Sequence, residues 1–213
     1  MGSDFSNEYD GPAHPVNLDG FWIYESEVTN AMYRKCKEAG ICTGPGGLAS
    51  NTVMDYFQNP EYDQYPVINV IFDDAATYCK WAGVDLPSEA QWEKAARGTD
   101  GRTYPWGQIM DNSKLNYNNL IGDTNKVKSF SSGASPYGVL DMAGNVAEWT
   151  RSLLNRYPYV ADDGREDTSS GIGIAIRGGG WNSDAAQVST FMRWKAGADY
   201  FDHSLGFRCA KWP

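Results

Sequence analysis

The stretch "RGGGWNSDAAQVSTFMRWKAGADYFDHSLGFRC", from Arg177 to Cys209, has two ends of one kind and a middle of another. Both ends combine glycine, an aromatic residue and arginine. In the middle, residues 182–205, large aromatic and small polar side chains fit neither the 3.6-residue period of a helix nor the two-residue period of a strand. We therefore expect an irregular loop held between two rigid segments, with Trp181 and Phe207 in the core.

The segment before this stretch carries signals for regular structure. A helix is predicted from Thr29 to Gly40, since apolar residues follow at spacings of three and four. Residues 67–70 are apolar and predict a buried strand. A second helix is predicted after it, capped by Asp73 and ending at Gly83.

The segment "LPSEAQWEKAARG" gives the clearest helix signal. Ser88 is placed to cap the first turn, Gln91 is the partner of a capping box, and Gly98 ends the helix. Beyond Gly98 the chain is rich in Gly, Asn, Asp, Ser and Pro, which favour turns. Two or three helices followed by a loop-rich half predict an α+β fold with short strands and long ordered loops.

Composition excludes several classes of function. The chain has 213 residues, enough for one domain with its own core, and a net charge of −9, which argues against a nucleic-acid surface. No apolar run approaches the roughly 20 residues that span a bilayer. We expect a soluble protein without membrane insertion, either cytoplasmic in a bacterium or exported as part of a larger protein. With two histidines and no paired CxxC cysteines, zinc and histidine-triad sites are not expected.

Five motifs occur in an order and spacing that resembles the formylglycine-generating-enzyme (sulfatase-modifying factor) family. They are "LPSEAQWEKAARG", "YPWG", "SPYGVLDMAGNVAEWT", "RGGGW" and "GFRCA". The resemblance covers about residues 15–211 and implies an irregular α+β fold related to C-type lectins. The first half looks most like the versions fused to bacterial signalling kinases. We expect a flexible tail over residues 1–13 and a single domain over residues 14–213.

A first calcium site is predicted in "DMAGNVAEW". Asp141 and Glu148 are hard oxygen ligands on one glycine-containing turn, which suits calcium. The resemblance implies that the Asp141 side chain, the Gly144 and Val146 carbonyls and Glu148 bind the ion. In the alternative interpretation, Asp141 caps a turn and Glu148 pairs with an arginine.

A second calcium site is implied by the resemblance in "NYNNLIGDTNKV". Its ligands would be Asn116, the Tyr117 carbonyl, Asp123 and the Asn125 carbonyl. The alternative is a plain turn, because Asn and Asp are common turn residues.

The resemblance also bears on catalysis. Active members bind copper(I), which prefers soft thiolates, through two cysteines in the loop that follows the Gly-Gly-aromatic motif. In this sequence Ser183 and Val188 occupy those positions. The related iron-dependent sulfoxide synthases need three histidines. We therefore expect no copper site and no enzyme activity.

The cysteines have a structural interpretation instead. The resemblance implies a disulfide between Cys79 and Cys209, which would close a long loop if the compartment is oxidising. The alternative is a pair of buried thiols in contact. Cys36 and Cys42 could form a second, local bridge.

The loop over residues 182–205 is similar to the variable region of proteins diversified by retroelements. In such proteins adenines are rewritten, and changes at Asn codons yield Ser, Asp, Ala, Gly, Tyr, Phe and His, which are abundant here. Four residues require other codons: Gln187, Met192, Trp194 and Lys195. A mixture of large rings and small polar residues is typical of antibody-like binding surfaces.

The sequence thus predicts a non-catalytic module that binds a protein or a small molecule through a diversified C-terminal face. One alternative is a sensor module of a bacterial kinase system with one fixed partner. Another is a copper-dependent formylglycine-generating oxidase or an enzyme with an unrecognised centre. The predicted ligand-binding residues are Ser183, Asp184, Gln187, Met192, Trp194, Lys195, Asp199, Tyr200, Phe201, Asp202 and His203.

Overall fold

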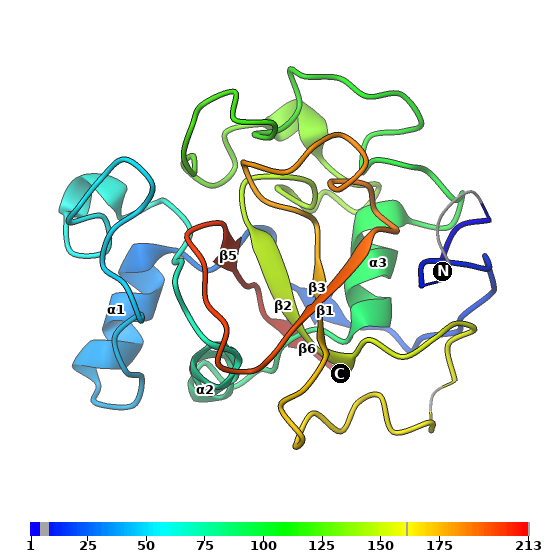
Figure 1. Cartoon of the computed structure of the whole chain (residues 1–213), viewed down its shortest axis with the longest axis horizontal. Helices are drawn as coiled ribbons and strands as arrows, with labels where there is room; N and C mark the ends of the chain where they lie inside the picture. The colour runs from blue at the N-terminus through cyan, green and yellow to red at the C-terminus, as the bar shows by residue number, and fades with distance from the viewer. Residues whose placement is uncertain (5–8, 161, 213) are drawn as a thin grey trace.

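A twisted four-stranded sheet lies at the centre of the molecule (Figure 1). The computed structural model describes residues 1–4, 9–160 and 162–212. The strands follow the order β4-β3-β2-β5, with β2–β3 and β3–β4 antiparallel and β2–β5 parallel. Their bounds are Ala147–Leu153 for β2, Ile174–Arg177 for β3, Arg193–Ala196 for β4 and Leu205–Gly206 for β5. A small antiparallel pair, β1 (Trp22–Ile23) with β6 (Ala210–Lys211), joins the two ends of the domain.

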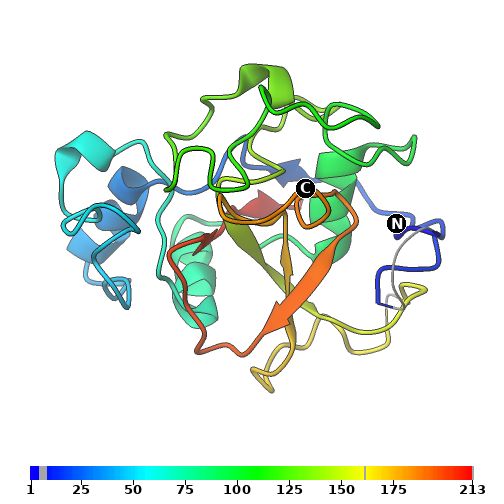
Figure 2. The ribbon, with the colours of Figure 1, turned by 45° about the horizontal axis from the view of Figure 1, so that its top comes forward.

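The α-helices of the described residues all belong to the first half of the chain, as the sequence predicts. They are α1 (Asn30–Glu38), α2 (Phe72–Trp81) and α3 (Glu89–Arg97). Two short 3-10 helices, η1 (Pro60–Tyr62) and η2 (Ser131–Gly133), lie in the loops. Both views place α3 on one side of the sheet and α2 on the other, with α1 beyond α2 (Figure 2). None of the helices described is long and apolar enough to cross a membrane.

The local helix signals are largely confirmed. Thr29 caps α1 and accepts a hydrogen bond from the Met32 amide, and Ser88 and Gln91 form the predicted capping box of α3. The cap of α2 was predicted wrongly. Ile71 takes the N-cap position without a side-chain bond, and Asp73 lies inside the first turn, where a carboxylate favours the positive end of the helix dipole.

The predicted strand over residues 67–70 is also corrected. The segment is buried, with Val67, Ile68 and Val70 each at most 2% exposed, but it pairs with a neighbour only locally. The Val67 amide donates to the Val28 carbonyl, while the next bonds go to loops. The apolar composition of this segment thus indicates that it is buried, but it does not show that the segment pairs as a regular β-strand.

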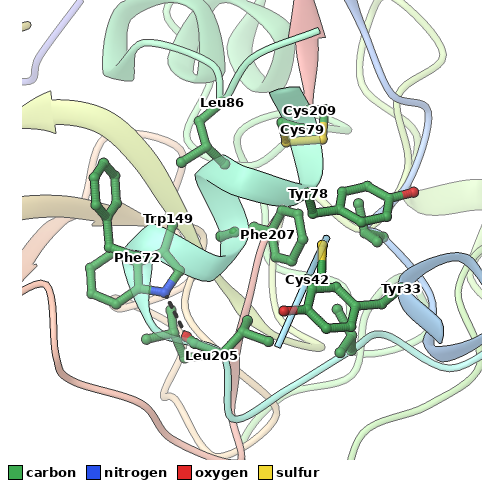
Figure 3. Packing of buried hydrophobic residues seen from close by; sticks show 14 of the residues in the cluster. Tyr33, Cys42, Phe72, Tyr78, Cys79, Leu86, Trp149, Leu205, Phe207 and Cys209 are labelled. Atoms are coloured by element: carbon green, nitrogen blue, oxygen red, sulfur yellow. Dashed lines mark hydrogen bonds between the residues drawn. A yellow bond between two sulfur atoms is a disulfide. The ribbon is translucent and has the colours of Figure 1, made fainter. Parts of the chain in front are cut away.

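The main core packs aromatic rings from both halves of the chain against α2 (Figure 3). The Phe72 and Trp149 rings meet edge to face at 5.9 Å, and the Tyr78 and Phe207 rings at 5.5 Å. The buried Trp149 indole donates to the Val70 carbonyl. Trp181 is 3% exposed and Phe207 fully buried, which confirms their predicted place in the core.

Disulfides pair all four cysteines of the sequence. Cys79 of α2 is bonded to Cys209, and Cys36 of α1 is bonded to Cys42. The first bond spans 130 residues and fixes the segment after β5 to α2 (Figure 3). Both pairs agree with the sequence analysis.

The start of the chain packs against the domain. The Gly2 amide donates to Glu93 of α3, and the Arg97 side chain donates to the Gly2 carbonyl. Further on, the Tyr9 carbonyl accepts a bond from Arg193 of β4. In residues 1–4 and 9–13 the structure therefore shows specific contacts with α3 and the sheet, which the expected flexible tail did not include.

Replacing Cys79 and Cys209 together with alanine should lower the free energy of unfolding by about 2–4 kcal/mol, because the long loop is no longer closed in the unfolded chain. The matched control is the same double replacement of Cys36 and Cys42, whose loop spans only six residues; its loss should be smaller. Urea denaturation with and without reductant measures both effects. Equal losses for the two pairs would contradict this account.

Candidate functional site

Buried ion pairs hold the two rigid ends of the C-terminal stretch. Arg177 of "RGGGW" donates to Glu93 of α3 at 2.6 Å, and Arg208 of "GFRCA" donates to both oxygens of Glu148 at 2.7 and 2.8 Å. Both arginines are fully buried. Burial alone would raise the pKa of Glu93, but Arg177 and Arg97 lower it below the usual value. The charged pair is therefore the stable state of this contact.

The loop between these ends has an anchor of its own. Arg193, the first residue of β4, donates from two nitrogens to the two oxygens of Glu89, each at 2.6 Å. Its guanidinium also lies 3.8 Å from the centre of the Tyr157 ring. Glu89 is fully buried, so this bidentate pair ties the edge strand of the sheet to α3.

Among residues 182–205, five side chains are buried, eight are exposed and the other eleven are partly exposed. The buried set, at most 5% exposed, is Val188, Ser189, Thr190, Arg193 and Leu205. The exposed set, here called the display face, is Asn182, Asp184, Ala186, Trp194, Lys195, Asp199, Tyr200 and Phe201. Three of the predicted ligand-binding residues are exposed aromatic rings, at 48% for Trp194 and Tyr200 and 45% for Phe201.

A cavity of about 510 Å³ opens within this loop. Six of the predicted ligand-binding residues line it: Ser183, Gln187, Trp194, Lys195, Tyr200 and Asp202. The other five, Asp184, Met192, Asp199, Phe201 and His203, lie outside its lining. The sheet also contributes to this cavity, since Ala147 and Ile176, which were not among the predicted residues, form part of the wall. The only signals for them were the place of Ala147 within "SPYGVLDMAGNVAEWT" and of Ile176 directly before "RGGGW".

Two of the acidic residues fix the backbone of the loop. The Asp184 carboxylate accepts bonds from the amides of Ala186 and Gln187, while the Gln187 side chain accepts from the Asp184 amide. The Asp202 carboxylate accepts from the amide and the hydroxyl of Ser204. Burial, and then the Asp202 charge, raises the pKa of Tyr200. The Tyr200 hydroxyl is therefore protonated at neutral pH and can donate to a ligand.

Ser183 and Val188 lie on either side of Gly179. An added Cβ on Gly179 would meet Val188 at 3.0 Å and Ser183 at 3.1 Å, so both side chains lie close to this glycine. Ser183 accepts a bond from the Gly180 amide, and Val188 packs in a cluster with Tyr104 and Tyr117. Neither side chain offers a soft metal ligand.

In the first predicted calcium region, Glu148 already has partners. Its carboxylate accepts from the Trp92 indole at 2.8 Å and from Arg208, which is the arginine pair that the sequence analysis gave as the alternative. Glu27 lies in the same buried region, and its Oε2 has no hydrogen-bond partner among the described residues. Burial, followed by the charge of Asp141, raises the pKa of Glu27 well above its usual value. The charged form of Glu27 is disfavoured there, and a cation bound close by would stabilise it.

In the second predicted region, Asn116 and Asp123 are close in space. The Asn116 side-chain nitrogen donates to the Asp123 carbonyl at 2.8 Å, while its buried Oδ1 has no partner among the described residues. The Asp123 carboxylate accepts three bonds from Ser50 and Thr52. A buried amide oxygen without a partner, on a residue bonded to the Asp123 backbone, suits a cation that prefers oxygen ligands.

Nowhere in the described chain do three His, Cys, Asp or Glu side chains gather closely enough to hold a metal by themselves. A calcium ion in either region would therefore depend on amide and carbonyl oxygens as well as carboxylates. Tyr117 and Asn125 in the second region, and Gly144 and Val146 in the first, could supply those carbonyls.

A small twisted sheet, helices at its flanks and a long loop held at both ends by buried ion pairs define an irregular α+β domain of the C-type-lectin-like class. The sequence matches the model of the sulfatase-modifying factor enzyme 1-like domain over residues 1–213. The chain belongs to this family of formylglycine-generating-enzyme-like proteins.

Relatives in this family have different activities. The serine/threonine-protein kinase Pkn1 of Chlamydia trachomatis is 31% identical over 94% of this chain, which covers 34% of that kinase. The chain thus spans about a third of the length of this relative. The inactive C-alpha-formylglycine-generating enzyme 2 of Mus musculus is 34% identical to this chain. The matching region covers 99% of this chain and 82% of the mouse protein. The formylglycine-generating enzyme of Streptomyces coelicolor is 29% identical, over a region that covers 99% of this chain and 85% of that enzyme.

Among solved structures, variable protein 1 of Treponema denticola has the same fold. The two superpose with a TM-score of 0.74 at 22% sequence identity, covering all of this chain and 91% of the other. The fold predicted from the five motifs is thereby confirmed.

Replacing Arg193 with methionine should lower the free energy of unfolding by about 3–5 kcal/mol, because the buried Glu89 then loses its bidentate partner and keeps only the longer contact with Arg177, at 3.6 Å. Lys195→Met, two residues further along β4, is the matched control. Lys195 is exposed, so its replacement should change stability by less than about 0.5 kcal/mol. Chemical denaturation of the two variants distinguishes an anchor from a displayed residue. If both variants lose the same stability, the distinction between buried anchors and exposed residues in this loop is wrong.

Proposed function

We propose that this protein is a non-catalytic recognition module, which binds a protein or small-molecule ligand through the display face and its cavity. The observation that carries the proposal is the combination of exposed rings with buried anchors in one short loop. Trp194 is nearly half exposed, while its neighbour Arg193 is buried and bound to Glu89. Side chains on the display face can therefore differ without disturbing the backbone that presents them.

Several observations support the absence of catalysis. All four cysteines are in disulfides, so none is free as a thiolate ligand for copper(I). The two positions aligned with the copper-binding cysteines carry Ser183 and Val188, and Val188 is fully buried. One relative is itself an inactive formylglycine-generating enzyme. Copper- and oxygen-dependent oxidation of a cysteine in a sulfatase-type peptide would refute this part of the proposal.

The display face is further proposed to be diversified in the population. The fold is that of a protein named as variable, and residues 182–205 combine five buried anchors with eight exposed positions. Such a loop accepts changes at the exposed positions without loss of the fold.

A second candidate function is a sensor module with one fixed partner in a kinase system. It is favoured by the similarity to Pkn1, of which the matching part is about one third. Both functions use the same surface. They differ in whether the sequence of that surface is constant.

Deep sequencing of the gene from a bacterial population separates these two functions. If the face is diversified, substitutions should cluster at display-face codons such as those of Asp184, Tyr200 and Phe201. Codons for the buried Val188 and Arg193 should stay constant, since changes there unfold the protein. A constant sequence throughout residues 182–205 would favour the fixed-partner module instead.

Calcium is proposed as a structural cofactor that rigidifies the loops beneath the display face. In the second region, Asn116 and Asp123 with the Tyr117 and Asn125 carbonyls would hold one ion. In the first region, Asp141 with the Gly144 and Val146 carbonyls would hold another, and Glu148 would be shared with Arg208. A bound divalent cation supplies positive charge there and no chemistry.

Chelation by EDTA should lower the melting temperature of the native protein, and added calcium should restore it. At a calcium concentration of 100 times the Kd, binding stabilises the fold by about 2.7 kcal/mol. Asn116→Ala should reduce the calcium-dependent part of the shift. Asn17→Ala, which removes an exposed amide side chain outside both calcium regions, is the control and should preserve it. If calcium does not change the melting temperature, the cofactor proposal is wrong.

A further inference from the structure

Two loops outside residues 182–205 also present apolar side chains to solvent. Leu48 and Met54 are 41% and 85% exposed, and Leu120 and Ile121 are 56% and 49% exposed. We call these four residues the framework rim. Single exposed apolar residues are common, but several in adjacent loops usually indicate an interaction surface.

Hydrogen bonds place the loop with Leu120 and Ile121 beside the display face. The Asn118 amide donates to the Ser183 carbonyl at 2.8 Å, and the Asn119 amide donates to the Trp181 carbonyl at 2.9 Å. Leu120 and Ile121 follow directly. Their side chains are therefore presented next to the segment in which the cavity-lining residue Ser183 lies.

The loop with Leu48 and Met54 contacts another part of the display face, at Phe201. Phe201 packs so closely on Gly46 that an added Cβ would lie 3.2 Å from the ring. The Asn69 side chain donates to the Gly47 and Ala49 carbonyls, and the Asn69 amide donates to the Asp202 carbonyl. The loop with Leu48 and Met54 is thus joined to the segment that carries Tyr200 and Phe201.

The two loops are also tied to each other. Asn51 donates to the Gly122 carbonyl at 2.8 Å, and the Asp123 carboxylate accepts bonds from Ser50 and Thr52. These bonds fix the backbone on both sides, so the apolar side chains cannot be withdrawn by a small loop movement. Their exposure is built into the fold.

The charge of the combined surface is negative. The display face has three aspartates within or beside it, Asp184, Asp199 and Asp202, against the single exposed lysine Lys195. The rim segments 48–54 and 118–123 contain no basic residue, and their one acidic residue, Asp123, is buried and does not add to the surface charge. A partner that fits has apolar side chains at the centre of its contact and lysines or arginines around them.

We propose that the framework rim is a constant part of the binding interface, and that the occupant is a folded protein with an apolar patch bordered by basic side chains. This inference rests on the proposed recognition function and extends it beyond residues 182–205. A cavity of about 510 Å³ can hold a small ligand. The rim lies outside that cavity, and only a macromolecule can cover the rim and the display face together.

The test uses the intact protein and a displayed library of a small three-helix domain, randomised on one face, as the probe. Enriched clones should combine apolar residues with Lys or Arg. The variant Leu120→Ser/Ile121→Ser should weaken most clones about tenfold or more, which corresponds to about 1.4 kcal/mol. Trp22→Ser removes an apolar side chain that is 73% exposed on β1. This control should leave their affinity unchanged.

A second variant, Trp194→Ala/Tyr200→Ala, separates this inference from the proposed function. Clones that lose affinity with this variant but keep it with Leu120→Ser/Ile121→Ser would overturn the role of the rim and leave the recognition function standing. Clones that ignore both variants, or a library from which none is enriched, would overturn both. Circular dichroism and melting temperatures, expected to match those of the unmodified protein, show that each variant is folded.

Discussion

The structure depends on arginines buried opposite glutamates. Arg177, Arg193 and Arg208 come from the last part of the chain, and their partners lie on α3 or in β2. A guanidinium without a partner is very costly in a protein interior, so the folded core is stable only with each pair in place. The pairs therefore specify how the loop-rich half docks on the helical half, where little regular secondary structure could do so.

This constraint explains why motifs far apart in the sequence occur together. Glu93 in the helix motif is matched by Arg177 before the glycines, and Glu148 after the tight turn is matched by Arg208 near the C-terminus. The glycines between them permit close packing: Gly178, with φ of 92°, lies so near the Trp92 ring that a side chain would collide with it. The buried ion pairs and the close packing at glycine thus restrict neighbouring positions in the same motifs.

The fold class, the helices α1 and α3, both disulfides and the exposed rings of the candidate site could be predicted from the sequence. Each depends on a local signal, such as the capping box at Ser88, or on motifs shared with a family. The cap of α2 and the irregular backbone over residues 67–70 could not, because tertiary contacts decided them. The same holds for the wall of the cavity, since Ala147 and Ile176 reach it only through the pairing of β2, β3 and β4.

The bond between Cys79 and Cys209 gives the exposed loop a safeguard. Both sulfurs lie outside residues 182–205, one before the loop and one after it. A protease that cuts the loop once therefore produces two pieces that are still covalently joined. The short C-terminal piece also keeps Arg208 paired with Glu148 and β6 paired with β1. A module that offers an accessible loop to its surroundings can thus be nicked there without shedding its last strand.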